Sequence, residues 1–237
     1  MNKTLLFHSF GGTKNADPFY DISITQYKEL LLSIKSILPS KDIVISFDDG
    51  YKSIIPAVDF ANKLKFKTNV NIVTSKINHV NFLSKKEIKY LYDQSTNIGS
   101  HSHTHKDLTQ LSTDLLEKEL SKSKNYLEEI LGVPIEYLSL PYGGYTNKTI
   151  LIARQFYKKI GISKPLFFDR KFLVGRLPIH NANIMKYKFI SSVLSGDKNI
   201  NYQLKCIIIQ LIKKFFPNDS YRNIKNRFSG LNTKNYF

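Results

Sequence analysis

Two stretches of the chain combine residue types that could activate water on a metal ion. Asp48 and Asp49 follow an apolar run at residues 43–45 that predicts a buried strand, and Gly50 permits a sharp turn after them. Successive side chains of a strand point to opposite sides, so one carboxylate can bind a metal while its neighbour takes a proton. For this stretch alone a solvated turn is the alternative, because Asp-Gly pairs are common turn formers.

A histidine cluster follows farther along the chain. His101 and His105 are four positions apart, so a helical segment would place both rings on one face, where they could share a metal. Asp49 could then complete a set of two histidines and one carboxylate, which suits a catalytic zinc and other divalent first-row metals. A simple surface cluster of histidines is the alternative. His103 lies between the two ligands and is expected to point elsewhere.

Strands and helices alternate through most of the chain, which predicts an α/β protein with a parallel sheet. The expected strands cover residues 4–7, 42–47, 68–73, 97–100 and 135–140. The expected helices cover residues 23–37, 52–64, 84–92, 112–130 and 148–159. The candidate residues all fall just after strands, and this is where parallel α/β barrels carry their chemistry.

Composition narrows the class of protein further. The net charge of +16 could attract nucleic acid, anionic lipid or acidic glycans, but the lysines are widely spread and no nucleic-acid recognition motif is present. We therefore expect no nucleic-acid partner. The lone cysteine, Cys206, cannot form an internal disulfide, and together with the absence of a signal peptide it predicts a cytoplasmic, reducing environment. No apolar run reaches the roughly 18 residues of a membrane span.

Three ordered motifs resemble those of the polysaccharide deacetylase family, the NodB-type domain of carbohydrate esterase family 4. They are Ser-Phe-Asp-Asp-Gly at residues 46–50, Gly-Ser-His-Ser-His-Thr-His at 99–105 and Leu-Pro-Tyr-Gly at 140–143. The resemblance implies a distorted (β/α)7-type barrel and metal-dependent removal of an N- or O-linked acyl group from a sugar. We therefore expect residues 1–196 to form the NodB-type catalytic domain and residues 197–237 a basic, helical extension.

The resemblance also implies roles for single residues. Asp48 resembles the catalytic base, while Asp49, His101 and His105 resemble the metal ligands. Zn²⁺ is the first expectation for the metal, with Co²⁺, Ni²⁺ or Mn²⁺ as alternatives. In the third motif, Tyr142, which follows Pro141, resembles the residue whose backbone N–H helps to hold the oxyanion.

The chain departs from the family pattern in two places. The family usually has an arginine that orients the base two residues before the proline of the third motif, and here that residue is Ser139. Arg176 could replace it, bind an acidic group of the substrate, or be a solvated surface residue. The final Leu-any-His motif supplies the general acid, and its nearest match, residues 177–180, has one residue too many. His180 is the candidate acid, and His8 is a candidate for the site rim, as a substrate contact or a structural hydrogen bond.

The leading interpretation is a metal-dependent carbohydrate deacylase acting on a sugar or glycan intermediate, with cell-surface glycan synthesis as the suggested context. The alternative is a catalytically impaired relative that binds glycan without turnover, which Ser139 and the irregular last motif suggest. A nucleic-acid-binding protein is a third interpretation, based on charge alone. Residues 204–216 combine apolar residues with lysines, which favours a helix packed on the barrel over a membrane-surface helix. Peripheral membrane contact through this tail is the second option.

Overall fold

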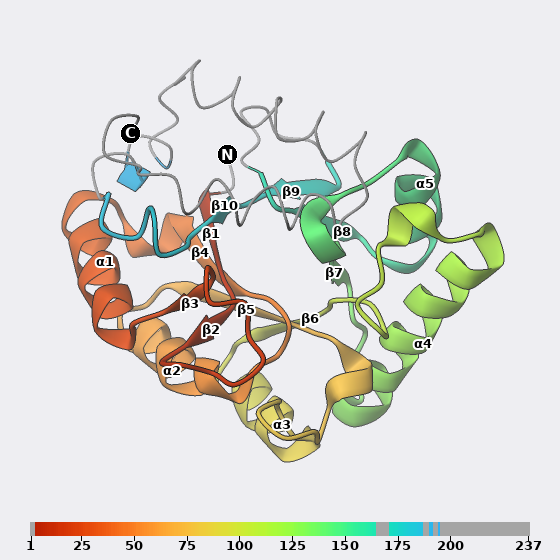
Figure 1. The fold of residues 1–237 in the computed structure, drawn as a ribbon, viewed down its shortest axis with the longest axis horizontal. Coiled ribbons are helices and arrows are strands. Elements are labelled where there is room, and N and C mark those ends of the chain that lie inside the picture. Colours follow the sequence, from red (N-terminus) through yellow and green to blue (C-terminus); the bar gives the residue numbers. More distant parts are fainter. Residues whose placement is uncertain (1–2, 165–170, 187–189, 192–193, 195–237) are drawn as a thin grey trace. The chain divides into compact units, whose positions relative to one another are not determined.

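The computed structural model describes residues 3–164, 171–186, 190, 191 and 194. Its main feature is a sheet of eight parallel strands with α-helices along the outside (Figure 1). The strands are β1 (Lys3–Phe7), β4 (Ile43–Phe47), β5 (Lys67–Ile72), β6 (Asn97–Ser100), β7 (Tyr137–Ser139), β8 (Lys159–Ile162), β9 (Leu173–Gly175) and β10 (Leu177–Pro178). The helices are α1 (Ile24–Ile37), α2 (Ile55–Lys63), α3 (Lys85–Asp93), α4 (Thr113–Leu131) and α5 (Asn147–Phe156). A second, two-stranded sheet pairs β2 (Ser9–Phe10) with β3 (Asp21–Ile22).

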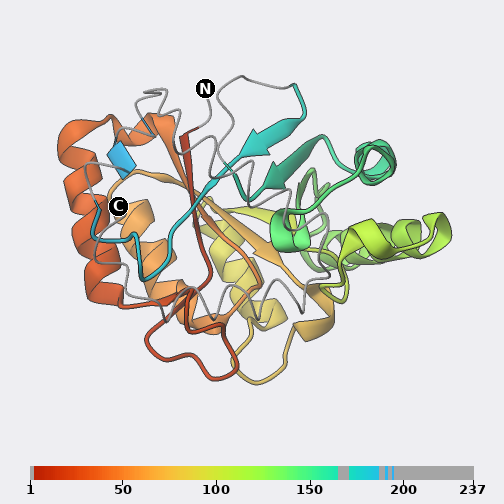
Figure 2. The same ribbon diagram turned by 45° about the horizontal axis from the view of Figure 1, so that its top comes forward.

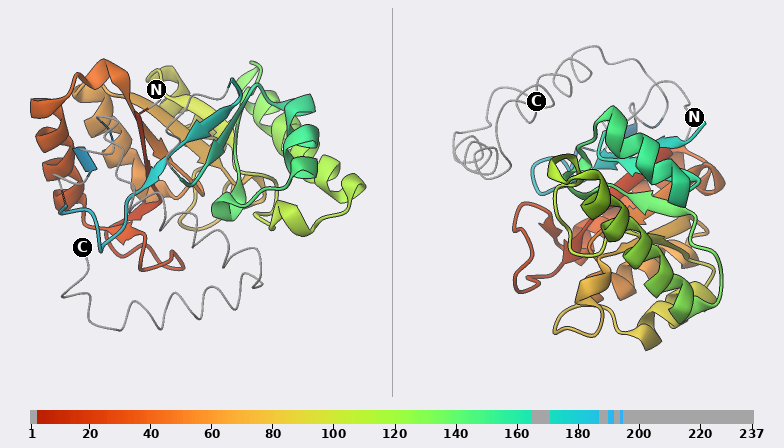
Figure 3. Two further views of the ribbon diagram at one scale, coloured as in Figure 1. Left: turned by 90° about the horizontal axis from the view of Figure 1, so that it is seen from above. Right: turned by 90° about the vertical axis from the view of Figure 1, so that its right-hand side faces the viewer.

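The large sheet curves into a nearly closed barrel. Its strand order is β10-β1-β4-β5-β6-β7-β8-β9, so β9 and β10 stand at its two ends. These two strands are separated in the chain by the single residue Arg176. In Figures 2 and 3 the cyan β9–β10 segment runs between the red β1 and the green β8. The expected α/β barrel is therefore confirmed. Arg176 lies at the junction of the two end strands, which we call the seam of the barrel.

Parallel pairing brings the chemistry-bearing residues to one end of the barrel. The register aligns Leu5 with Ile45 between β1 and β4, and Ile72 with Ser100 between β5 and β6. Because all strands point the same way, the residues that follow them meet at the same edge. Those residues include His8 after β1, Asp48 after β4, His101 after β6, Pro141 after β7 and His180 after β10.

Most expected elements are present, and local signals explain their ends. Ser23 caps α1, and the capping box of Ser84 with Glu87 opens α3 as predicted. Gly132 ends α4 with a left-handed φ of 70°. The apolar faces of the helices pack on the strands, and buried residues such as Leu31 on α1 and Leu120 on α4 are 0% exposed.

One expected helix is too long. The predicted helix over residues 148–159 ends at Phe156, and residues 159–162 form β8 between β7 and β9. This strand has only four residues, and its glycine, Gly161, resembles a helix terminator in the sequence. The helix expected over residues 52–64 also differs, because residues Lys52–Ile54 form a 3-10 turn before α2.

The C-terminal predictions cannot be compared with the structure. The extension expected at residues 197–237, including Cys206 and the helix expected at residues 204–216, lies outside the described residues. Within the described part of the chain, no helix has the length and apolar character needed to cross a membrane.

Candidate active site

The two neighbouring carboxylates are placed by the end of β4. Asp48 extends the ladder, since its N–H donates to the carbonyl of Phe7 at 3.0 Å, and its side chain is buried. Asp49 and Gly50 then adopt left-handed backbone with φ of 72° and 79°, which confirms the sharp turn expected there. Among residues with a side chain, aspartate tolerates this conformation well. Both carboxylates reach the imidazole of His101, at 3.8 Å from Asp48 Oδ2 and 3.5 Å from Asp49 Oδ1.

The histidine pair lies on a loop and not on the helical segment considered for it. The chain between His101 and His105 has left-handed backbone at Ser102 and His105, with φ of 64° and 61°. Serine hydroxyls stabilise the turn, because Ser100 Oγ accepts from Ser102 N–H and Ser102 Oγ accepts from His105 N–H, both at 3.1 Å. The loop still brings the two ring nitrogens within 3.2 Å of each other.

A carboxylate on α4 holds this loop from outside. Glu119 Oε2 accepts from the backbone N–H groups of His103 and Thr104 at 3.0 and 2.9 Å, and Glu119 Oε1 accepts from the Thr104 hydroxyl at 2.6 Å. Glu119 was not predicted as a site residue. In the sequence, Glu119 falls on the mostly apolar inner side of the predicted helix. A carboxylate in that position needs hydrogen-bond partners, and this could have marked it as a structural or site residue.

The three expected metal ligands come together. Asp49 Oδ1 lies 3.5 Å from His101 Nε2 and 3.3 Å from His105 Nε2, and the two imidazole nitrogens are 3.2 Å apart. Tetrahedral ligands with metal bonds of about 2.1 Å are separated by about 3.4 Å. The triangle of ligand atoms therefore has the size that a tetrahedral metal site requires. Among the described residues, Asp49, His101 and His105 are also the group of His, Cys, Asp or Glu side chains whose ligand atoms lie close enough together to hold a metal ion.

The protonation of the histidines suits metal binding as well. Nδ1 of His101 lies 2.9 Å from the carbonyl oxygen of Ser139, which can only accept, so Nδ1 carries the hydrogen. The nitrogen of His101 left to face Asp49 and His105 is therefore Nε2. Burial lowers the pKa of His105 to about 4, with His101 adding to the shift. His105 is therefore neutral near pH 7 and can donate its own lone pair.

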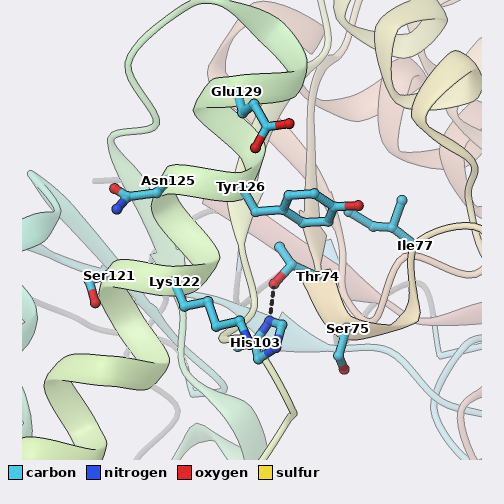
Figure 4. A pocket seen from close by; sticks show the side chains of 9 residues that line it. All are labelled: Thr74, Ser75, Ile77, His103, Ser121, Lys122, Asn125, Tyr126 and Glu129. Atoms are coloured by element: carbon cyan, nitrogen blue, oxygen red, sulfur yellow. Dashed lines mark hydrogen bonds between the residues drawn. The ribbon is translucent and has the colours of Figure 1, made fainter.

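His103 points away from this triangle, as expected. Its Nδ1 is hydrogen-bonded with the hydroxyl of Thr74 at 2.9 Å. Figure 4 shows the ring in a separate groove between α4 and the turn after β5. The groove has a volume of about 620 Å³ and includes Lys122 and Tyr126 of α4. None of the three candidate ligands lines it.

Asp48 sits in a buried polar network inside the barrel. Its Oδ1 accepts from Asn71 Nδ2 at 2.7 Å and from Arg176 Nη1 at 2.8 Å, and its Oδ2 accepts from the Ser139 hydroxyl at 2.8 Å. Burial alone would raise the pKa of Asp48, but the charges of Arg176 and His101 outweigh it and hold that pKa well below its usual range. Asp48 is therefore a carboxylate at neutral pH. Asn71 was not predicted as a site residue.

The third motif forms the wall next to His105. Pro141 begins a 3-10 turn after β7, and Tyr142 follows with a left-handed φ of 58°. The Tyr142 ring packs edge-on against His105 with centroids 4.8 Å apart, and 46% of the residue is exposed. Gly143 is also left-handed, and a side chain there would collide with Ser163. The turn thus holds Tyr142 beside His105, one of the three candidate metal ligands.

The two remaining histidines share an aromatic cluster. His8 packs on Tyr20 with centroids 4.4 Å apart, and His180 stacks on Phe19 at 4.2 Å and contacts Tyr20 at 6.2 Å. Burial lowers the pKa of His8, on which the charges of Asp49 and Asp48 act in the opposite direction. His8 thus lies within electrostatic range of the carboxylate pair. His8 and His180 therefore both contact Tyr20. In addition, Ala182 N–H donates to His180 Nδ1 at 3.2 Å.

An eight-stranded parallel barrel with two histidines and a carboxylate after its strands defines an α/β-barrel protein with a candidate catalytic metal centre. Residues 35–160, slightly more than half of the chain, match the family model described as polysaccharide deacetylase. The chain belongs to the polysaccharide deacetylase family. This is a family of hydrolases that act on carbon–nitrogen bonds other than peptide bonds.

Individual relatives are distant. YxkH of Bacillus subtilis (strain 168), which is named as a polysaccharide deacetylase, is 24% identical over 143 residues. These residues are 60% of this chain and 51% of YxkH. The chain thus spans about half the length of that relative. A polysaccharide deacetylase structure from Bacillus cereus is 21% identical and has a TM-score of 0.70. The match covers 81% of this chain and 68% of the Bacillus cereus chain. The Streptococcus pyogenes deacetylase PplD, solved with acetate, has a TM-score of 0.65 at 22% identity. The match covers 75% of this chain and 92% of the PplD chain. These structures share the fold.

Proposed function

We propose that the protein is a metal-dependent deacylase that hydrolyses an N- or O-acetyl group, or a similar acyl group, on a sugar or glycan intermediate. One observation carries this proposal. The ligand atoms of Asp49, His101 and His105 form a triangle with sides of 3.2 to 3.5 Å, and the carboxylate of Asp48 lies beside it. Family membership supplies the substrate class.

Asp49, His101 and His105 would hold the cation, and Zn²⁺ suits two imidazoles and a carboxylate. A divalent cation bound there supplies Lewis acidity toward water and the acyl carbonyl. Asp48 is the general base, because it is ionised at neutral pH and its Oδ2 lies 3.8 Å from His101 Nε2, next to the ligand set. Asp48 takes one proton from water as the oxygen attacks the acyl carbon.

The remaining steps need a donor for the oxyanion and a proton for the leaving group. The backbone N–H of Tyr142, held in the turn beside His105, is our candidate for the oxyanion donor. When the carbon–nitrogen bond breaks, the amine nitrogen must gain a proton while the acyl group leaves as a carboxylate. We assign this transfer to His180. Only the imidazolium form of His180 is acidic enough to give up this proton, and the ring becomes neutral in the step.

The biological setting belongs to the same proposal. A role in cell-surface glycan synthesis, a cytoplasmic location and peripheral membrane contact through residues 197–237 are proposals that come from the sequence. The membrane part is tested by co-sedimentation with anionic vesicles, with and without residues 203–237. Equal binding of both forms would contradict it.

The activity is tested with the zinc-loaded protein on two probes. The first is an N-acetylglucosamine oligosaccharide, and the second is 4-methylumbelliferyl acetate, whose phenolate leaves without a proton. We expect acetate release from both by the wild type, and a loss of about 10²- to 10⁴-fold in kcat for Asp48→Asn with the metal retained. Bound zinc without any acetate release would instead favour the impaired relative that binds glycan.

A further inference from the structure

Arg176 occupies an unusual place in the barrel. It is the single residue between β9, which pairs with β8, and β10, which pairs with β1. Its N–H points to the carbonyl oxygens of Ile162 and Lys164, at 3.1 and 3.0 Å. The chain therefore passes from one end strand of the sheet to the other at this residue, and the side chain has 0% exposure. Arginine is almost never so completely buried unless it is paired.

The guanidinium group contacts one oxygen of the Asp48 carboxylate directly and the other oxygen through Ser139. Nη1 donates to Asp48 Oδ1 at 2.8 Å, and Nη2 donates to Ser139 Oγ at 2.7 Å. Ser139 Oγ in turn donates to Asp48 Oδ2 at 2.8 Å. The three side chains thus form a closed ring in which each oxygen of Asp48 has a fixed donor. Charge-assisted bonds of this kind are directional and strong.

The surrounding backbone leaves room for this arrangement. A Cβ on Gly161 of β8 would approach Arg176 Nε to 3.0 Å and would collide with the Tyr137 hydroxyl. Because the guanidinium has no exposed surface, Arg176 is not a solvated surface residue, and it does not reach an acidic group of a substrate. Two of the interpretations considered from the sequence are therefore wrong.

We propose that Arg176 is the positioning residue for Asp48, holding the carboxylate toward the metal ligands from the seam of the barrel, and that Ser139 completes this ring where relatives carry an arginine. The inference rests on the proposed role of Asp48 as the base. Arg176 reaches Asp48 from the β9–β10 junction, whereas the family pattern expects this arginine at the position of Ser139 at the end of β7. Arg176 acts through Asp48 and touches neither substrate nor metal.

The test compares Arg176→Met, Arg176→Lys and Arg176→Ser with the exchanged double variant Ser139→Arg/Arg176→Ser, using zinc-loaded protein and 4-methylumbelliferyl acetate. We expect the single variants to keep their zinc and their KM within about threefold while kcat falls about 10- to 100-fold. The double variant should regain most of the kcat that Arg176→Ser loses, because Ser139 and Arg176 are in direct contact. A wild-type kcat in folded Arg176→Met, or a folded double variant without recovery, would overturn the proposal.

A second measurement separates this proposal from the proposed function. Crystal structures of the wild type and Arg176→Met, or of Arg176→Lys if the methionine variant does not fold, report the orientation of Asp48 without any turnover. We expect Asp48 Oδ2 to leave its position 3.8 Å from His101 Nε2 in the variant. An unchanged Asp48 would overturn the positioning role. An inactive wild type whose Asp48 still moves in the variant would refute only the deacylase activity.

Discussion

Oδ1 of Asp49 lies 3.3 Å from Nε2 of His105, although Asp49 follows β4 and His105 ends the loop after β6. Both residues have left-handed backbone, with φ of 72° and 61°. Such conformations are uncommon for residues with a side chain and cluster at functional sites. Left-handed backbone and candidate metal ligation therefore coincide at these two residues.

Removal of a single ligand should release the metal. We expect Asp49→Ala, His101→Ala and His105→Ala each to weaken zinc binding well beyond tenfold, because three protein ligands are the minimum of a catalytic site. The measurement is zinc content after loading and gel filtration. His103→Ala is the matched control, because His103 lies in the same loop but is bonded to Thr74. Full zinc content in Asp49→Ala would contradict the assignment of the site.

The sequence was sufficient for much of the fold because the decisive signals are local. The capping box at Ser84, the cap at Ser112 and the left-handed glycine at Gly132 mark helix ends directly. The apolar run before Asp48 identified the strand that places it. By contrast, β8 is four residues long and takes its strand identity from pairing with β7 and β9. That pairing is a tertiary property, so the sequence predicted a longer α5 instead.

The sequence predicted that Asp49, His101 and His105 meet, although the local geometry of the histidine pair differs. The spacing of His101 and His105 suggested one face of a helix, whereas left-handed Ser102 and His105 form a loop that achieves the same approach. The partners of that loop and of the base come from distant segments. Glu119 is on α4, and Arg176 is at the barrel seam, so only the assembled barrel shows what each one contacts.

Glu119 should matter for the metal without touching it. Its carboxylate accepts three hydrogen bonds from the histidine loop, two of them from backbone N–H groups. Glu119→Gln removes the negative charge and leaves a single acceptor oxygen, so the bonds that anchor the loop are weakened. We expect zinc affinity to fall about 10- to 100-fold, as for other residues that orient ligands. Glu129→Gln is the control, because Glu129 is an exposed residue of the same helix. Equal affinities in the two variants would contradict this role.

The general acid can be identified by comparing two leaving groups. An amine must be protonated when it departs, whereas the phenolate of 4-methylumbelliferyl acetate leaves unaided. We expect His180→Phe to lower acetate release from the N-acetylglucosamine oligosaccharide by about 10²-fold or more and to change hydrolysis of the aryl ester less than threefold. His8→Phe is the comparison, because both rings contact Tyr20. Should His8→Phe show the selective loss instead, His8 would be the acid.

His8 should make the fold sensitive to mild acid. Burial lowers its pKa, with His101 and Arg176 adding to the shift and the carboxylates of Asp49 and Asp48 opposing it. In the unfolded chain the imidazole titrates near its ordinary value of about 6.5. Below that pH the unfolded state binds a proton that the native state refuses, so stability falls as the pH drops toward the native pKa.

This pH dependence can be measured by urea unfolding of chelator-treated protein at pH 7.5, 6.5 and 5.5. The wild type should lose more stability between pH 7.5 and 5.5 than His8→Phe, which keeps an aromatic ring next to Tyr20. Parallel losses in both proteins would show that the titration of His8 does not contribute.

Gly161 should be sensitive to the smallest possible substitution. Its ideal Cβ would meet Arg176 Nε at 3.0 Å and the hydroxyl of Tyr137 more closely still. Gly161→Ala must therefore displace Tyr137 or the guanidinium that holds Asp48. We expect a loss of about 1–3 kcal/mol in the free energy of unfolding, as for other overpacked cores.

Gly144 provides the matched control for that substitution. A Cβ there would meet only Thr109 Cγ2 at 3.6 Å, an ordinary van der Waals contact, and its φ of −80° suits any residue. Gly144→Ala should therefore change stability by less than about 0.5 kcal/mol. Gly161→Ala should also lower kcat on the aryl ester at unchanged zinc content, since movement of Arg176 reaches the base through its bond to Asp48. A Gly161→Ala protein with wild-type stability and kcat would show that the barrel interior can absorb the extra methyl group without moving Arg176.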